Sequence, residues 1–201
     1  MTLDNHNIDN QFVRIYDVWA KKTPLYAKKY EKDVIKAMCD FGKGTTEVSD
    51  AKGKILGAAY ETLIIALFIG LYSKKKADFT PYEDTKDCGQ PIQYWGNLDS
   101  KKLRHAYPRL REYIFIALVS RTPEIDWIEL DKGNLTINEV VSMLMDTMEA
   151  YINYGLSVLA EKLKEDESYF YNKNSFLDIF MQLTNPDIEK ITDTDAAESL
   201  D

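Results

Sequence analysis

Apolar residues recur at helical spacing along most of the chain, with partners three and four positions apart on one face of a helix. The series nearest the N-terminus consists of Phe12, Ile15, Tyr16 and Trp19. The longest series, toward the C-terminus, consists of Val141, Met145, Met148, Ile152, Gly155 and Leu159. The alternation that is typical of β-strands is nearly absent. The pattern therefore predicts an all-α protein.

Residues that favour helix ends divide this pattern into separate helices. Thr23 and Pro24 form a cap and first-turn pair for a helix that extends to Met38. Thr136 and Glu139 have the spacing of a capping box, which predicts the start of the long helix. A turn is expected just before it, at residues 131–134, and a last short helix is expected from about residue 174.

The most apolar segment, residues 55–72, predicts a central helix over about residues 50–73. A helix that is apolar on all sides in a globular protein is expected to be surrounded by other helices. Three lysines follow it, as they often follow a membrane span, but Glu61 and Thr62 interrupt the segment and leave ten uninterrupted apolar or glycine residues. A spanning helix needs about 20, so we expect no membrane contact.

The segment 77–98 is rich in proline and glycine and is expected to be irregular, with short extended pieces such as residues 92–95. The next helix is expected to begin near Asp99, and Pro108 lies within its pattern. Pro108 either kinks this helix or occupies the first position of a helix that restarts there, and the sequence leaves both possibilities open.

These elements predict a bundle of six or seven helices around the buried central helix, with the irregular segment 77–98 outside the helical pattern. We expect one helical domain over residues 1–184. Residues 185–201 contain six acidic residues and one lysine, so they carry −5 of the chain's net charge of −8. Such a segment is expected to be a disordered, solubilising tail, or alternatively a partner-binding hook.

Few residues of the chain suit metal, disulfide or nucleophilic chemistry. Cys39 and Cys88 are the two cysteines, and they are too few for a disulfide framework. With no secretory signal pattern at the N-terminus, they indicate a cytoplasmic protein. His6 and His105 are the two histidines, and no phosphate-binding loop, dinucleotide fingerprint or zinc-protease motif is present. We therefore expect no metal and no cofactor.

A basic segment over residues 98–111 carries a charge of +4 within this acidic protein. Its candidate phosphate- or nucleic-acid-binding residues are Lys101, Lys102, Arg104, His105, Arg109 and Arg111, with Tyr94 and Trp95 just before them. Clustered cations beside aromatic rings can bind phosphates and stack on bases. The alternative, which we favour, is a solvent-exposed helix face paired with neighbouring acidic residues.

Glu61 is the one acidic residue within the central apolar segment. A buried carboxylate must be paired with a base or must have a raised pKa, and the available bases include Arg14, Arg104, Arg109 and Arg111. Such a group is a candidate general acid or base for a hydrolase-type enzyme. A structural ion pair is the alternative reading.

The sequences of three segments within residues 51–122 resemble those of a group of small, all-helical bacterial proteins of unknown function. They read AAYETLIIALFIGLYSKKK, GQPIQYWGN and AYPRLREYIFIAL. The resemblance implies a helical fold and covers about a third of the chain, and it identifies no catalytic residue.

Three functions remain compatible with the sequence. The first, which we favour, is a protein-interaction or regulatory subunit that is not an enzyme. The second is a nucleic-acid or phosphate-binding module that uses the basic residues 101–111. The third is a hydrolase that uses Glu61. A protein partner or a homo-oligomer is expected, because the central helix or the stripe along residues 141–159 could need a second chain to cover it.

Overall fold

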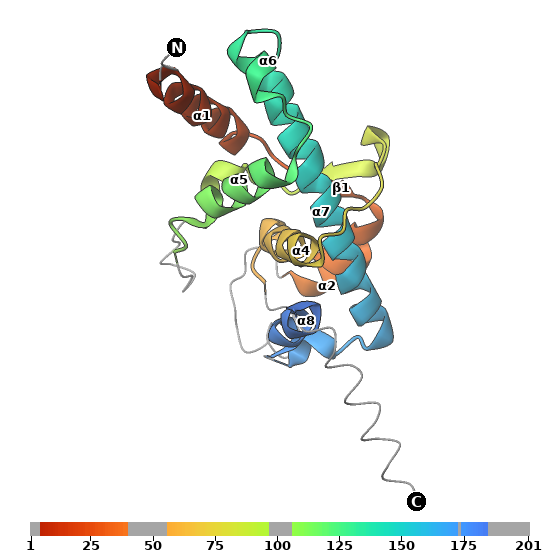
Figure 1. The fold of residues 1–201 in the computed structure, drawn as a ribbon. Coiled ribbons are helices and arrows are strands. Elements are labelled where there is room, and N and C mark those ends of the chain that lie inside the picture. Colours follow the sequence, from red (N-terminus) through yellow and green to blue (C-terminus); the bar gives the residue numbers. More distant parts are fainter. Residues whose placement is uncertain (1–4, 40–55, 97–105, 173, 185–201) are drawn as a thin grey trace, which may run out of the picture. The chain divides into compact units, whose positions relative to one another are not determined.

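The computed structural model describes residues 5–39, 56–96, 106–172 and 174–184, and describes no side chains before residue 11. Its α-helices are α1 (Asn5–Ala20), α2 (Lys36–Met38), α4 (Ala59–Ser73), α5 (Leu110–Arg121), α6 (Trp127–Asp131), α7 (Ile137–Glu165) and α8 (Ser175–Thr184). Shorter elements are the strands β1 (Leu25–Ala27) and β2 (Thr85–Asp87), the π-helical turn η1 (Glu31–Ile35), and the 3-10 turns η2 (Tyr82–Asp84), η3 (Ile92–Tyr94) and η5 (Tyr169–Tyr171). The prediction of a mainly helical fold is confirmed (Figure 1).

The chain forms two compact units, each assembled from two stretches of sequence. Unit 1 comprises Met1–Lys29 and Asp78–Ala150, and unit 2 comprises Tyr30–Ala77 and Tyr151–Asp201. The boundary between Ala150 and Tyr151 falls inside α7, so this helix contributes its first half to unit 1 and its second half to unit 2. The single domain over residues 1–184 stays a prediction, and the acidic tail 185–201 lies outside the described residues.

Unit 1 is organised around aromatic side chains of α1 and α5. Ile15 and Trp19 of α1 are fully buried, and the Trp19 ring lies 5.4 Å from the ring of Phe115. Tyr16 meets Phe115 edge-on at 5.3 Å. These are the positions that the apolar spacing places on one helix face, so the prediction of the first helix is confirmed. Rings offset or edge-on at such distances stabilise beyond the area they bury.

The segment after Pro24 is a strand, and the prediction of a helix starting there is wrong. Strand β1 pairs antiparallel with β2, with Leu25 opposite Asp87 and Ala27 opposite Thr85. The backbone N–H of Leu25 donates to Glu149 Oε1 at 2.9 Å. These bonds come from residues about 60 and 124 positions away, so the partners of the strand cannot be read from the local pattern. Helical structure follows over residues 29–38, through η1 and α2, and it ends at Met38 as predicted.

The irregular segment 77–98 contains its extended piece at β2 rather than at residues 92–95. Residues Ile92–Tyr94 form the 3-10 turn η3, which the N–H of Trp95 closes by donating to the carbonyl of Ile92 at 2.8 Å. Ile92 and Trp95 are fully buried. Pro91 precedes the turn with φ −57° and fixes the backbone for entry into it.

Pro108 lies in a turn before α5 and kinks no helix among the described residues. The N–H of Leu110 donates to the carbonyl of Tyr107 at 3.0 Å, and α5 begins at Leu110. A proline suits the second position of such a turn, because its φ is fixed near the required value. Helix α5 begins after a turn at Tyr107, as one alternative predicted, but two residues later than Pro108. The expected cap Asp99 lies outside the described residues.

The start of α7 has the predicted capping box. The N–H of Glu139 donates to Thr136 Oγ1 at 3.3 Å, and the N–H of Thr136 donates to Glu139 Oε2 at 2.8 Å. The N–H and the hydroxyl of Thr136 both donate to the Glu139 carboxylate and hold the pKa of Glu139 below its usual value. The predicted turn before α7 is present and contains Gly133 with φ +79°. The short helix α6 directly before it was not predicted.

In unit 2 the central helix α4 begins at Ala59, later than the predicted start near residue 50. Residues 56–58 are not helical: Leu56 forms an isolated bridge with Cys39, and Ala58 is extended. Residues 50–55 lie outside the described part. The predicted end at Ser73 is confirmed, and Lys74 adopts the left-handed conformation that closes many helices. Among the described helices, none has both the length and the apolar character needed to cross a bilayer.

Helix α4 packs backbone against backbone with the second half of α7. A Cβ atom placed on Gly155 would lie 1.9 Å from the carbonyl oxygen of Ala66, and one on Gly70 would lie 2.3 Å from that of Tyr151. Thr62, Leu63, Ala66, Leu67 and Ile69 of α4 are fully buried. Glycine at both crossing points therefore lets the two helices approach closely, and α4 fills the centre of its unit.

Candidate functional site

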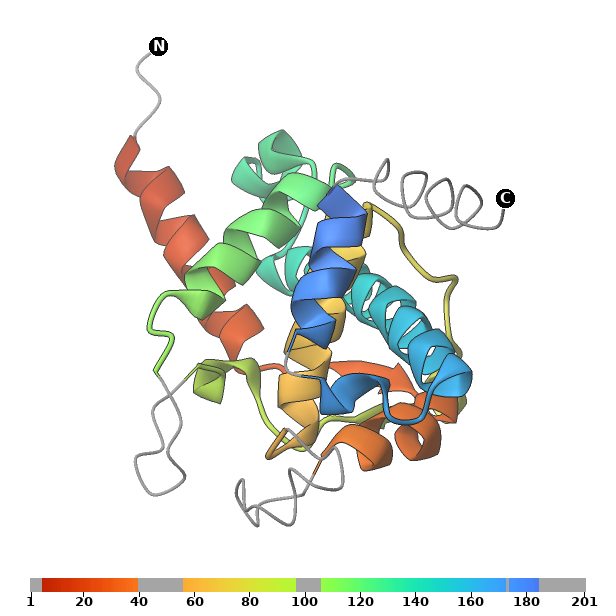
Figure 2. The ribbon, with the colours of Figure 1, turned by 90° about the horizontal axis from the view of Figure 1, so that it is seen from below.

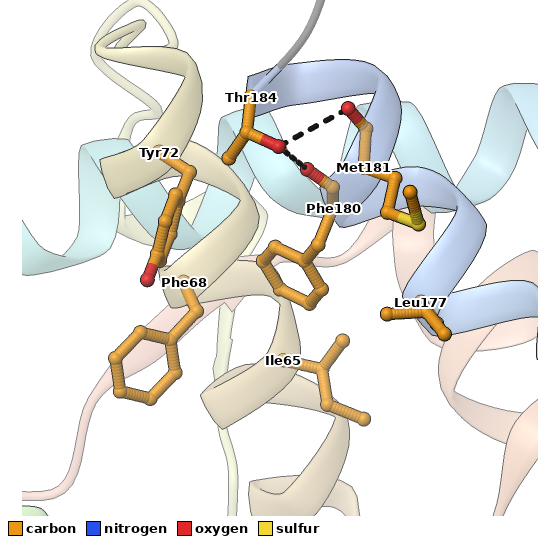
Figure 3. A pocket seen from close by; sticks show the side chains of 7 residues that line it. All are labelled: Ile65, Phe68, Tyr72, Leu177, Phe180, Met181 and Thr184. Carbon is orange, nitrogen blue, oxygen red and sulfur yellow. Dashed lines mark hydrogen bonds between the residues drawn. The ribbon is translucent and has the colours of Figure 1, made fainter.

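One face of α4 is not closed over by the described chain, and there it forms a groove of about 460 Å³ with α8. Helix α8 lies along α4 on this side (Figure 2). The α4 wall consists of Ile65, Phe68 and Tyr72, and the α8 wall consists of Leu177, Phe180, Met181 and Thr184. Ile65 and Leu177 lie at one end of the groove, and Tyr72 and Thr184 lie at the other (Figure 3).

The groove is apolar and its rim is open to solvent. Phe180 meets Tyr72 edge-on with 5.4 Å between ring centres. Leu177, Met181 and Tyr72 remain 57%, 46% and 54% exposed. The one aliphatic hydroxyl, that of Thr184, donates within α8 to the carbonyls of Phe180 at 3.0 Å and Met181 at 3.1 Å (Figure 3). Water therefore contacts large apolar side chains that nothing in the described chain covers.

The sequence of α8 places apolar side chains on two faces of this short helix. Ile179 is buried and anchors the helix. Its start is held by the hydroxyl of Ser175, which donates to the carbonyl of Asn172 at 2.7 Å, and by the Phe176 ring stacked on Phe170 at 5.1 Å. Leu177, Met181 and Thr184 follow at i, i+4 and i+7 and lie on the outer face. The groove wall is thus fixed in position by the inner face of its own helix.

The described residues that line the groove include no charged side chain, but one charged residue lies near each of its ends. Asp178 is exposed beside Leu177, and Lys74 is exposed two residues beyond Tyr72. The next two lysines have a different position, because Lys75 lies over the Tyr154 ring at 5.9 Å and Lys76 lies over the Tyr151 ring at 5.4 Å. One exposed acidic residue, Asp178, whose charge also acts on Tyr169, therefore lies near one end of the groove, and one exposed basic residue, Lys74, lies near the other.

Glu61, the candidate general acid or base, lies in the first turn of α4 and not in the middle of the helix. It is half-buried, and its Oε2 accepts the backbone N–H of Gly57 at 2.7 Å. A carboxylate at this position satisfies an N–H before the helix and interacts favourably with the positive end of the helix dipole. Its described contact therefore serves the helix start, and a catalytic role for Glu61 stays an untested prediction.

Most of the basic segment lies outside the described residues, namely Lys101, Lys102, Arg104 and His105. Of the remainder, Arg109 is exposed, and Arg111 donates to the carbonyl of Gln93. Tyr94 is 47% exposed, but Trp95 is fully buried and its Nε1 donates to the carbonyl of Gln90 at 3.2 Å. Trp95 is thus not presented for stacking on a base, although Tyr94 is.

The carboxyl group of Glu149 in unit 1, which is partly exposed but largely desolvated, was not among the sequence candidates. Burial, and then the charge of Asp146, raise the pKa of Glu149 to about 7, although the hydrogen bond from the N–H of Leu25 opposes the shift. Burial, with smaller contributions from Asp87 and Glu149, raises the pKa of the Cys88 thiol to about 11. Cys88 is therefore protonated at neutral pH and poorly suited to act as a nucleophile. The sequence feature that could have indicated Glu149 is the position of its carboxylate next to the apolar stripe of residues 141–159 in α7.

No group of three or more histidine, cysteine, aspartate or glutamate side chains within the described residues could hold a metal ion. The chain gave no match to protein families, to characterised proteins or to solved structures. Inference about function therefore depends on the geometry of the groove and of these individual residues.

Proposed function

We propose that this protein is an interaction subunit that binds an apolar helix face of a protein partner in the groove between α4 and α8. The observation that carries the proposal is the open apolar surface along the groove, where Leu177, Met181 and Tyr72 are each about half exposed. Exposed apolar patches of this kind on globular proteins mark interaction sites.

The dimensions and composition of the groove favour a helix as its occupant. Each wall is a stripe along one helix, with Ile65, Phe68 and Tyr72 on α4 and with the outer face of α8 opposite. A helix can lay apolar side chains at i, i+3 or i+4, and i+7 between two such stripes. Met181 adds a flexible, polarizable side chain that adapts to different apolar surfaces.

The chemistry of the lining favours a protein segment over a small molecule. Small-molecule sites combine apolar walls with a few converging polar groups that orient the ligand. Here the Thr184 hydroxyl is bonded within its own helix, and the Tyr72 hydroxyl is the one other side-chain polar group of the lining. Such a groove can select an apolar ligand by its shape but offers few hydrogen-bonding groups to orient it.

We also propose a cytoplasmic location. It is supported by the thiols of Cys39 and Cys88, which are buried and not joined in a disulfide. Cysteines in this state are typical of a reducing compartment.

Photo-crosslinking in cells tests the interaction directly. Replacing Leu177 with p-benzoyl-L-phenylalanine places a cross-linker on the groove rim, and replacing Ile116 of α5, which is 64% exposed, gives the matched control. We expect a protein adduct from position 177 whose attached peptide has apolar residues at helical spacing. The adduct should disappear when Met181→Glu is added. Absence of an adduct, or equal adducts from both positions, would contradict the proposal.

A further inference from the structure

We propose that the helix that occupies the groove is α8 of a second copy of this chain, so that two copies form a two-fold symmetric dimer through α4 and α8. This inference rests on the proposed function, because it uses the same groove and names its partner. The occupant must present apolar side chains at helical spacing on an exposed helix face. Helix α8 presents such a face with Leu177 and Met181.

This single patch carries both a projecting part and a hollow that such a part can fill. Leu177 and Met181 project from the rim and are about half exposed, whereas Ile65, Phe68 and Phe180 are less exposed and form the floor. In a two-fold dimer the same patch on both copies must fit itself. The projecting Leu177 and Met181 of each copy can fill the hollow of the other.

The placement of charge favours the same arrangement. Helices α4 and α8 run in the same direction along the groove, with Ile65 and Leu177 at one end and Tyr72 and Thr184 at the other (Figure 3). In the sequence, Asp178 follows Leu177 directly and Lys74 comes two residues after Tyr72, so each charge lies near a different end. A two-fold axis across the middle of the groove reverses the second copy. Lys74 of each copy then approaches Asp178 of the other, so two ion pairs form at the rim, each between a positive and a negative side chain.

The same arrangement disfavours the parallel alternative, in which Asp178 would face Asp178 and Lys74 would face Lys74. Like charges placed together at an interface suppress the wrong pairing. The charges therefore select the antiparallel geometry, in which α8 meets α8 at about its midpoint.

The small size of the groove predicts that the dimer is weak. A standard interface has roughly 20–30 residues on each side, and the groove is lined by seven. We therefore expect a micromolar dissociation constant, with monomers and dimers in exchange at ordinary protein concentrations.

Sedimentation equilibrium of the full-length chain over a series of concentrations tests the inference. We expect a reversible monomer–dimer equilibrium that Met181→Glu and Leu177→Glu each weaken by at least about tenfold, because a charge would be buried in an apolar interface. Ile116→Glu is the matched control and should leave the equilibrium unchanged. Both groove residues are about half exposed, so the variants should fold, and circular dichroism of each checks this.

Charge reversal provides a second readout that a merely structural effect would not reproduce. Lys74→Glu and Asp178→Lys should each weaken the dimer by about fivefold, since each pair occurs twice, and the double variant should restore it. Failure of the double variant to recover would overturn the antiparallel geometry.

The outcomes separate this inference from the proposed function. A chain that stays monomeric, or a dimer that Met181→Glu leaves intact, overturns the second-copy inference. If position 177 then cross-links to a different protein through an apolar helix, the proposed function stands without the dimer. If position 177 gives no specific adduct either, both are overturned.

Discussion

At the scale of single residues, Glu149 shows how the fold changes the chemistry of a side chain. Its carboxyl group is largely buried on α7, and its one described hydrogen bond comes from the N–H of Leu25 at the start of β1. This bond satisfies the backbone N–H of Leu25, a donor at the first residue of β1 that would otherwise need another partner. Burial nevertheless disfavours the charged form, so the pKa rises to about 7.

The raised pKa of Glu149 makes stability depend on pH. Below pH 4.5, its ordinary pKa, the group is protonated in both folded and unfolded chains and has no effect. Between pH 4.5 and about 7 the unfolded chain ionises first, so the free energy of unfolding falls as the pH rises. Above pH 7 the full penalty, about 3 kcal/mol, is present.

Glu149→Gln should remove this penalty while keeping an oxygen that accepts from Leu25. We expect the variant to be more stable than the natural chain at pH 8, by up to about 3 kcal/mol, and to differ little at pH 4. Urea denaturation at the two pH values measures the difference. Glu161→Gln, an exposed change on the same helix, is the control and should show no such pH dependence. Equal stability of Glu149→Gln and the natural chain at pH 8 would contradict the burial argument.

At the scale of elements, the contact between α4 and the second half of α7 decides how the centre of unit 2 is packed. Gly155 and Gly70 let backbone carbonyls of the facing helix come closer than any side chain would allow. Glycine inside a helix costs roughly 1 kcal/mol relative to alanine. The close approach offsets this cost by bringing the buried faces of the two helices into contact.

Gly155→Ala should therefore destabilise the protein even though alanine is the better helix former. The added methyl group would lie 1.9 Å from the carbonyl oxygen of Ala66, and both are fixed in helices, so the helices must separate. We expect a loss of about 2–4 kcal/mol in the free energy of unfolding, measured by urea denaturation. Gly133→Ala is the control: its methyl would meet nothing within 4 Å, so only the positive φ penalises it, by about 1 kcal/mol. A smaller loss for Gly155→Ala than for Gly133→Ala would refute the close-packing interpretation.

At the scale of the whole molecule, net charge opposes self-association through the groove. Each copy carries −8, of which −5 belongs to residues 185–201, and the groove itself is uncharged. Two such copies repel at low ionic strength, and salt screens the repulsion over a distance of about 10 Å at 0.1 M. In the proposed dimer we expect the exposed Lys74–Asp178 ion pairs to contribute less than this long-range repulsion when salt is low.

A chain that ends at Thr184 should dimerise more tightly at low salt, because its net charge is −3. For the full chain we expect the dimer to strengthen as NaCl rises from about 0.02 M to about 0.3 M, and for the shortened chain we expect a smaller change. Sedimentation equilibrium at both salt concentrations measures this. If the dimer weakens with salt in both chains, then the local ion pairs exceed the net repulsion and our charge argument is wrong.

The candidate groove could be predicted only in part from the sequence. The apolar spacing predicts the helices that form it and indicates that the central helix could need a second chain to cover it. The groove itself depends on which side α8 packs against, and its walls meet across more than 100 positions of sequence. Glu149 was missed for a similar reason, since the backbone N–H that it binds belongs to Leu25, which lies 124 residues earlier.

The sequence by itself determined the features whose causes are local. The helical spacing of α1, the capping box of Thr136 and Glu139, and the end of α4 at Ser73 all depend on residues within a few positions of one another. Only the tertiary structure decided that residues 25–27 form a strand, that α4 starts at Ala59, and that one face of α4 stays open beside α8. Each of these depends on contacts between distant segments, whose energies outweigh local preference and leave no periodic trace in the chain.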